Sequence, residues 1–279
     1  MNFDLEGCDL LTSTALSELA MKLPPQLEHL RLDCDRCPQL DDDCLEGLGH
    51  GLARLSEEGK LKGLELSFTG CALLGRSEHS LMCLAEGLAK LGHLVDCQLS
   101  VNDTPLGNLG LFALGRALRG LTQLLTLNVN LEDCESAYSP LSEAGMRAFA
   151  EGISQLCRVR ALSCKLSEFK GVNGLQHFGS ALDSLVCLED FTLYVSQCTG
   201  MSNAGLARVG RGIGHLSQLV RLKLSIQEKA AVWTTSAKGW LSSGCYAFLT
   251  STSAAASRFK TRTLAAWALA WQATRTCRS

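Results

Sequence analysis

The chain has 279 residues, of which 46% are hydrophobic and 19% are charged, and its formal net charge is −2. This composition predicts a globular protein with a large core, and no run of about 20 apolar residues indicates a membrane-spanning helix. The first residues lack a basic and apolar signal segment, so we expect a cytoplasmic protein.

Short strands are predicted at eight places, because apolar residues recur two positions apart there, as in a strand buried on one face. The first strand contains Phe3 and Leu5. Its successors begin roughly thirty residues apart, which indicates a repeated unit. In chain order they are Leu30/Leu32, Leu64/Leu66, Cys97/Leu99, Leu127/Val129, Leu162/Cys164, Phe191/Leu193 and Leu222/Leu224.

A helix is predicted between successive strands. In one unit Leu45, Leu48, Leu52 and Leu55 have the spacing of a buried helical stripe, and the other units repeat these columns. Two further columns hold only Gly or Ala, although Gly in a helix costs about 1 kcal/mol relative to Ala. A neighbouring backbone is therefore expected to come too close for a larger side chain. The columns are Gly49, Ala85, Gly115, Ala150, Gly179, Gly210 and Gly51, Gly87, Ala117, Gly152, Ala181, Gly212.

A single strand and helix cannot bury both apolar faces, whereas units stacked in a row share one continuous core. Parallel strands lie about 4.8 Å apart and helices need roughly 10 Å, so the helix side must fan outward. The predicted fold of residues 1–226 is thus an α/β solenoid of about eight strands and seven helices. Its parallel strands line the concave face, and its helices form the convex face.

The repeat also carries a recognisable motif. The stretches Leu91-x-x-Leu94-x-x-Cys97-x-Leu99-x-x-Asn102 and Leu216-x-x-Leu219-x-x-Leu222-x-Leu224 are its best copies. This pattern resembles the leucine-rich-repeat family, in particular the branch that includes ribonuclease inhibitor and the repeat domains of NOD-like receptors. The resemblance implies a horseshoe and a binding module for other proteins.

The expected function is non-catalytic recognition of a protein partner by the concave strand face and the adjoining loops. Side chains that alternate with the buried strand residues should face the hollow. The loops between Leu66 and Leu81 and between Val129 and Met146 are the longest, and we expect them to form a rim. The predicted contact residues are Arg31, Asp33, Glu65, Asp96, Gln98, Asn128, Asn130, Lys165, Asp190, Thr192, Tyr194, Arg221 and Lys223.

An alternative function is that of a Ran-type GTPase-activating protein, which is also a leucine-rich-repeat solenoid. Members of that family carry Phe-Thr-Gly-Arg in a loop, and Phe68-Thr69-Gly70 stands in an equivalent loop here, with Arg76 as the nearest downstream arginine. Such an arginine could stabilise charge during phosphoryl transfer. The six His fall in different units and columns, so we expect no catalytic constellation, no enzyme and no cofactor.

Fourteen Cys are present. Cys37, Cys71, Cys134 and Cys198 recur at one repeat position, where a buried thiol can replace an apolar residue. We expect all fourteen to be free. Although Cys34 and Cys37 have the spacing of half a zinc site, no second pair follows, so no metal site is predicted. The run at 41–43 consists of three Asp, which at a helix amino terminus would offset the helix dipole.

Residues 227–279 differ from the repeats. From residue 229 onward there is no Asp or Glu, but there are seven Lys or Arg and all four Trp. Three interpretations remain open. The segment is a partly disordered end unrelated to the repeats; or it caps the last repeat with Trp240, Leu241, Cys245 and Phe248; or it forms an amphipathic helix with Leu264, Trp267 and Trp271 that touches a membrane surface or a partner. Because residues 1–228 hold all 28 acidic residues, we do not expect nucleic acid as a partner.

Overall fold

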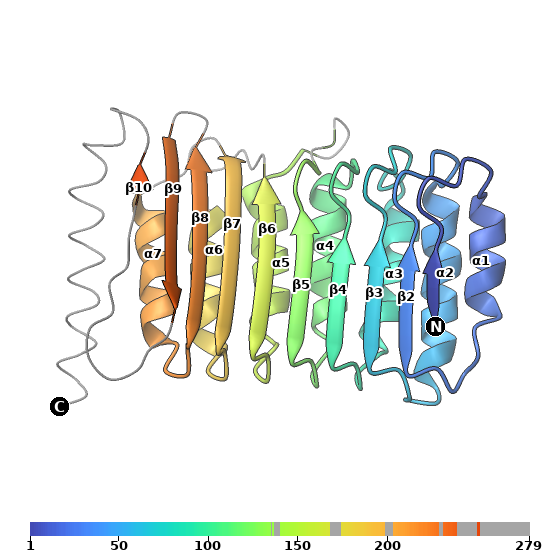
Figure 1. The fold of residues 1–279 in the computed structure, drawn as a ribbon, viewed down its shortest axis with the longest axis horizontal. Coiled ribbons are helices and arrows are strands. Elements are labelled where there is room, and N and C mark those ends of the chain that lie inside the picture. Colours follow the sequence, from blue (N-terminus) through green and yellow to red (C-terminus); the bar gives the residue numbers. More distant parts are fainter. Residues whose placement is uncertain are drawn as a thin grey trace.

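The computed structural model describes residues 1–134, 136, 140–167, 174–198, 203–228, 231–238 and 250–251. Within these residues, ten strands form a single sheet whose spatial order follows the chain order. The first eight strands are parallel and alternate with helices, and the helices all lie against one face of the sheet (Figure 1). The other face carries no helix in the described part of the chain, and we call it the open face.

The strands occupy the predicted places. Within the first, Phe3 is in the strand, but Leu5 lies just beyond its end; the Leu5 amide still continues the ladder by donating to the Asp33 carbonyl at 2.8 Å. The parallel strands are β1 Asn2–Asp4, β2 His29–Asp33, β3 Gly63–Ser67, β4 Asp96–Ser100, β5 Thr126–Leu131, β6 Ala161–Ser167, β7 Asp190–Cys198 and β8 Arg221–Glu228.

The predicted helices are confirmed between successive strands. A short 3-10 helix, η1 (Leu182–Ser184), extends the sixth of them. The helices are α1 Ser13–Met21, α2 Asp42–Ser56, α3 Glu78–Ala89, α4 Gly107–Leu118, α5 Glu143–Ile153, α6 Gly174–Ala181 and α7 Asn203–His215.

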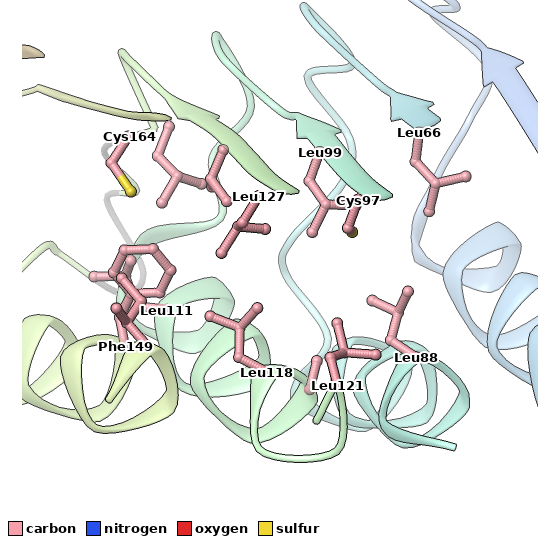
Figure 2. Close-up of a cluster of buried hydrophobic side chains, with 14 of the residues drawn as sticks. Leu66, Leu88, Cys97, Leu99, Leu111, Leu118, Leu121, Leu127, Phe149 and Cys164 are labelled. Atoms are coloured by element: carbon pink, nitrogen blue, oxygen red, sulfur yellow. The ribbon is translucent and has the colours of Figure 1, made fainter. Parts of the chain in front are cut away.

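The core is one layer between the sheet and the helix row. Figure 2 shows the inward strand residues Cys97, Leu99 and Leu127 above helix residues such as Leu118 and Phe149. Leu127 and Phe149 are completely buried, and the same continuous cluster of apolar side chains runs from Leu16 to Leu224. Shared burial between neighbouring units therefore holds the stack together, as the repeat pattern predicts.

The two small-residue columns bring helix backbones together, as predicted. A Cβ atom on Gly87 of α3 would lie 2.1 Å from the Gly49 carbonyl oxygen of α2, where only a hydrogen fits. The same contact recurs between α4 and α5, where a Cβ on Gly152 would meet the Gly115 oxygen at 2.4 Å. In α6 and α7, Gly212 approaches the Gly179 oxygen in the same way, also at 2.4 Å. These contacts join α2 with α3, α4 with α5 and α6 with α7, and a Cβ atom on Gly51 of α2 would similarly lie 2.7 Å from the Ala20 oxygen of α1.

The first five strands each end in a similar turn that contains a left-handed residue. The residue three positions after the last residue of the shared strand register has a positive φ in each of these units, a region that Gly adopts without strain. In the third unit this residue is Gly70, which directly follows Thr69. Asn102 links these turns, because its Oδ1 accepts hydrogen bonds from Thr69 Oγ1 at 2.8 Å and Asn130 Nδ2 at 3.2 Å. The five turn residues with a positive φ are Gly7, Arg36, Gly70, Asp103 and Asp133.

The described cysteines, eleven in number, are free. Cys37, Cys71 and Cys134 are buried at the predicted repeat position, and each thiol donates to a backbone carbonyl of the preceding unit at 2.9–3.2 Å. Burial raises the pKa of the Cys134 thiol to about 12, which keeps it protonated. Within the described ranges no three metal-ligating side chains lie together. The side chain of Cys198, and Cys245 and Cys277 altogether, lie outside the described residues.

The aspartates at 41–43 begin a helix, as predicted. Asp41 caps α2 by accepting a hydrogen bond from the Asp43 amide at 3.3 Å. Asp42 has a further role in the neighbouring unit, because its carboxylate accepts hydrogen bonds from the amides of Gly75, Arg76 and Ser77 at 2.6, 2.9 and 2.6 Å. A side chain of one unit thus fixes the loop that precedes α3.

We predict that Asp42→Ala lowers the free energy of unfolding by about 1–2 kcal/mol, because loop amides lose a charged acceptor. Urea unfolding monitored by circular dichroism measures this change. Asp43→Ala is the matched control, since Asp43 has the same charge in the same helical turn but is exposed. Equal destabilisation by the two variants would show that the loss comes from the helix end and not from the loop.

The sheet continues beyond the parallel strands. β9 (Ala231–Lys238) runs antiparallel to β8 along its whole length, and β10 (Thr250–Ser251) pairs antiparallel with β9. The predicted boundary at 226 therefore falls inside β8. The proposed cap residues Trp240, Leu241, Cys245 and Phe248 and the helix residues Leu264, Trp267 and Trp271 lie outside the described residues. No helix in the described part of the chain is long and apolar enough to cross a membrane.

Candidate protein-binding face

The side chains of the open face stand in straight rows. The reason is that the predicted positions of neighbouring strands pair with one another without a shift in register. Arg31 pairs in register with Glu65, which pairs with Gln98 of the next strand. These residues alternate with buried Leu and Cys residues, so the period of two places them on the side of the sheet that faces away from the helices. From β2 to β8 the central row is Arg31, Glu65, Gln98, Asn128, Ser163, Thr192 and Lys223.

Two flanking rows complete the face. Toward the beginning of the strands lie Asp96 and Asp190, with Arg221 beside Asp190. Toward the end of the strands lie the remaining predicted residues, which are Asp33, Asn130, Lys165 and Tyr194. The structure thus places every predicted contact residue on the open face, in one array that spans β2 to β8.

The end of the face over β2–β4 is acidic. Arg31 is shared between Asp33 and Glu65, with Nη–oxygen distances of 3.5 and 3.6 Å, and Gln98 Nε2 donates to Glu65 Oε1 at 3.1 Å. Asp96 is exposed beside them. We call Asp33, Glu65 and Asp96 the acidic end, because one arginine offsets only part of their charge.

A shallow hollow of about 250 Å³ opens between these side chains. It lies over Gly63, whose missing side chain leaves room; a Cβ atom there would come within 2.3 Å of His29 Nδ1. Glu65, Asp96 and Gln98 line the hollow. The middle of the face, over β4 and β5, continues with the uncharged amides of Gln98 and Asn128.

The opposite end, over β6–β8, combines an aromatic ring with cations. The ammonium group of Lys223 lies 4.9 Å from the centre of the Tyr194 ring, and that of Lys165 lies 5.9 Å from it. Both distances fall within the range of cation–π attraction. We call Lys165, Tyr194 and Lys223 the lysine–tyrosine cluster. Arg221 stands beside it and forms an ion pair with Asp190.

The two predicted rim loops differ in how much of them is described. The loop between β3 and α3 is complete, and the carboxylate of Asp42 holds its last residues. In the loop between β5 and α5, residues 135 and 137–139 are outside the described residues.

The residues that suggest a GTPase-activating function lie in the loop after β3, and each makes a structural contribution there. Phe68 is buried in the core, Thr69 donates to Asn102, and Gly70 has a φ of +73°. Arg76 donates from Nη2 to the Ala72 carbonyl at 3.2 Å, within its own loop. The sequence Phe-Thr-Gly is therefore explained here by packing and turn geometry.

Some contacts on the open face were not predicted from the sequence. Glu132 approaches Lys165, with an oxygen–nitrogen distance of 3.8 Å, and Asp35 Oδ1 accepts a hydrogen bond from the Thr69 amide at 2.7 Å. The contact between Tyr194 and the lysines was also missed. The aligned strand columns place Lys165 and Tyr194 side by side, but they do not show whether the ammonium group contacts the ring.

No protein-family model matches the sequence, and a search of curated proteins finds no match.

Proposed function

We propose that the chain is a leucine-rich-repeat solenoid, curved as a horseshoe, that binds a protein partner without catalysis. In this proposal the open face is the concave surface, and the partner lies across its strands in the cytoplasm. The observation that carries the proposal is the register of the face. Polar and charged side chains fill the central row and the row toward the strand ends over β2–β8, while the alternate residues form the core.

The size of the face agrees with a contact that includes loops. Seven steps of about 4.8 Å between eight strands give a length near 34 Å, and three residues of strand add roughly 10 Å of width. The resulting footprint of about 340 Å² is below the roughly 800 Å² per partner of a stable interface. The loop between β3 and α3 is the best placed to supply more area, since it adjoins the acidic end.

We predict that Tyr194→Ala combined with Arg221→Ala abolishes capture of the partner, because hot spots favour Tyr and Arg. Both side chains stand on the open face, and Arg221 is 69% exposed, so the melting temperature should stay unchanged within a few degrees. The measurement is affinity capture from a cytosolic extract, followed by mass spectrometry and binary binding of each purified hit.

The control variant removes the same kinds of side chain from the helix side. Phe112 and Arg116 of α4 are exposed, so Phe112→Ala with Arg116→Ala should leave capture intact. Retained binding by the Tyr194/Arg221 variant would refute the placement of the interface on the open face. The GTPase-activating alternative predicts faster GTP hydrolysis by a small GTPase and its loss in Arg76→Ala; we expect no acceleration.

A further inference from the structure

We propose that the lysine–tyrosine cluster binds an acidic segment, rich in Asp and Glu, of the partner polypeptide. This inference deepens the proposed function, because it names the chemistry of the partner at one end of the open face. It is carried by the contact between Lys165, Tyr194 and Lys223 and by the distribution of charge along the face.

The cluster holds two cations against one ring. Lys165 is half-exposed and has Glu132 at 3.8 Å, whereas Lys223 is exposed and meets no carboxylate among the described residues. Two ammonium groups beside the same ring repel each other, and the ring quadrupole offsets this repulsion only in part. A carboxylate that comes within reach of both ammonium groups would lower the electrostatic energy of both.

Tyr194 restrains the two lysine side chains of the cluster. Tyr194 lies on β7, Lys165 lies on the neighbouring strand β6, and Lys223 lies on β8 at the other side. Both ammonium groups contact the one ring, which holds them above the sheet. Holding the cations in place before binding reduces the side-chain entropy that a complex would otherwise lose. Tyr194 also supplies apolar contact area to a partner main chain.

The rest of the face restricts where an acidic segment can lie. Asp33, Glu65 and Asp96 repel it from the strands β2–β4, and the amides of Gln98 and Asn128 separate the two ends. Residues 1–228 as a whole contain all 28 acidic residues and 19 of the 26 basic ones, so most of this region disfavours anions. An acidic segment is thereby directed to the β6–β8 end.

The test uses the full chain and a fluorescein-labelled hexaglutamate peptide, with hexaglutamine as the uncharged probe. Binding is measured by fluorescence polarisation. Lys165→Gln with Lys223→Gln removes both charges and leaves polar, somewhat shorter side chains. Lys22→Gln with Lys90→Gln is the matched control, because these lysines are exposed at the ends of α1 and α3 and the change in net charge is the same.

We expect hexaglutamate to bind the unmodified protein, and the cluster variant to bind it about tenfold more weakly. The control variant should stay within about twofold, and raising the salt concentration from about 0.05 to about 0.3 M should weaken binding. Tyr194→Phe should bind like the unmodified protein, whereas Tyr194→Ala should lose affinity, since the ring and not the hydroxyl contacts the lysines.

The inference is overturned if hexaglutamate does not bind, if hexaglutamine binds equally well, or if both lysine variants lose the same affinity. Stronger binding of a single-stranded oligonucleotide than of hexaglutamate at equal charge would also overturn it, in favour of a nucleic-acid site. The proposed function fails separately, when Tyr194→Ala with Arg221→Ala leaves partner capture intact. A lost capture together with no peptide binding would keep the function and reject the acidic partner.

Discussion

Phe149→Ala is expected to lower the free energy of unfolding by about 3–5 kcal/mol, the largest effect that we predict for one substitution. Phe149 lies in α5 and is completely buried. Figure 2 shows its ring in the layer between the helices and the sheet. Removing the ring leaves a cavity that the surrounding units cannot fill, because their positions are fixed by the register on both sides.

Urea unfolding monitored by circular dichroism measures this loss. The control is Phe112→Ala, because Phe112 belongs to the neighbouring helix α4 and is 42% exposed. That variant should change the free energy of unfolding by less than about 1 kcal/mol. If both variants unfold at the same urea concentration as the unmodified protein, the shared core does not hold the stack together as described.

The second large effect is expected for Gly87→Ala. This substitution changes the free energy of unfolding in two opposing ways. Helix propensity alone predicts that Ala stabilises α3 by about 1 kcal/mol. The added Cβ atom, however, would lie 2.1 Å from the Gly49 carbonyl oxygen, and a backbone atom cannot move aside cheaply. We therefore expect a net loss of about 1–3 kcal/mol from overpacking.

Gly92→Ala provides the matched control for this prediction. Gly92 lies in the turn after α3, and an added Cβ atom would meet only the Gly120 oxygen at 3.5 Å, an ordinary contact. Thermal unfolding of both variants should show a lower melting temperature for Gly87→Ala and an unchanged or slightly higher one for Gly92→Ala. A higher melting temperature for Gly87→Ala would contradict the close approach of α2 and α3.

The sequence predicted the fold well where a pattern has a period. Leucines two apart mark a strand and leucines three and four apart mark a helix, so Leu64/Leu66 and Leu45/Leu48 could be assigned without coordinates. The membership of the open face followed from the same reasoning. Because side chains alternate along a strand, burial of Leu64 and Leu66 places Glu65 on the opposite side.

Contacts between units were harder to predict, since they depend on side-chain conformation. The three hydrogen bonds from the loop before α3 to Asp42 join residues more than thirty positions apart, and nothing in the repeat indicates them. The antiparallel strand β9 was also missed, because residues 231–238 no longer carry the repeat columns.

The pairing of helices, in contrast, was present in the sequence. In the first small column Gly stands in α2, α4, α6 and α7, and in the second it stands in α2, α3, α5 and α7. These glycines include the ones that meet a neighbouring helix, because Gly49 contacts α3, Gly115 contacts α5 and Gly179 contacts α7.

These close contacts between helix backbones have a mechanical consequence. Among the described glycines, none brings the backbones of α5 and α6 together; Gly174 at the start of α6 meets only the Met146 side chain. Side chains yield more readily than touching backbones, so a bending load on the row of repeats should concentrate at this junction. It lies behind β6, the strand that carries Lys165 of the lysine–tyrosine cluster. A small flexing there would change the distance between this cluster and the acidic end.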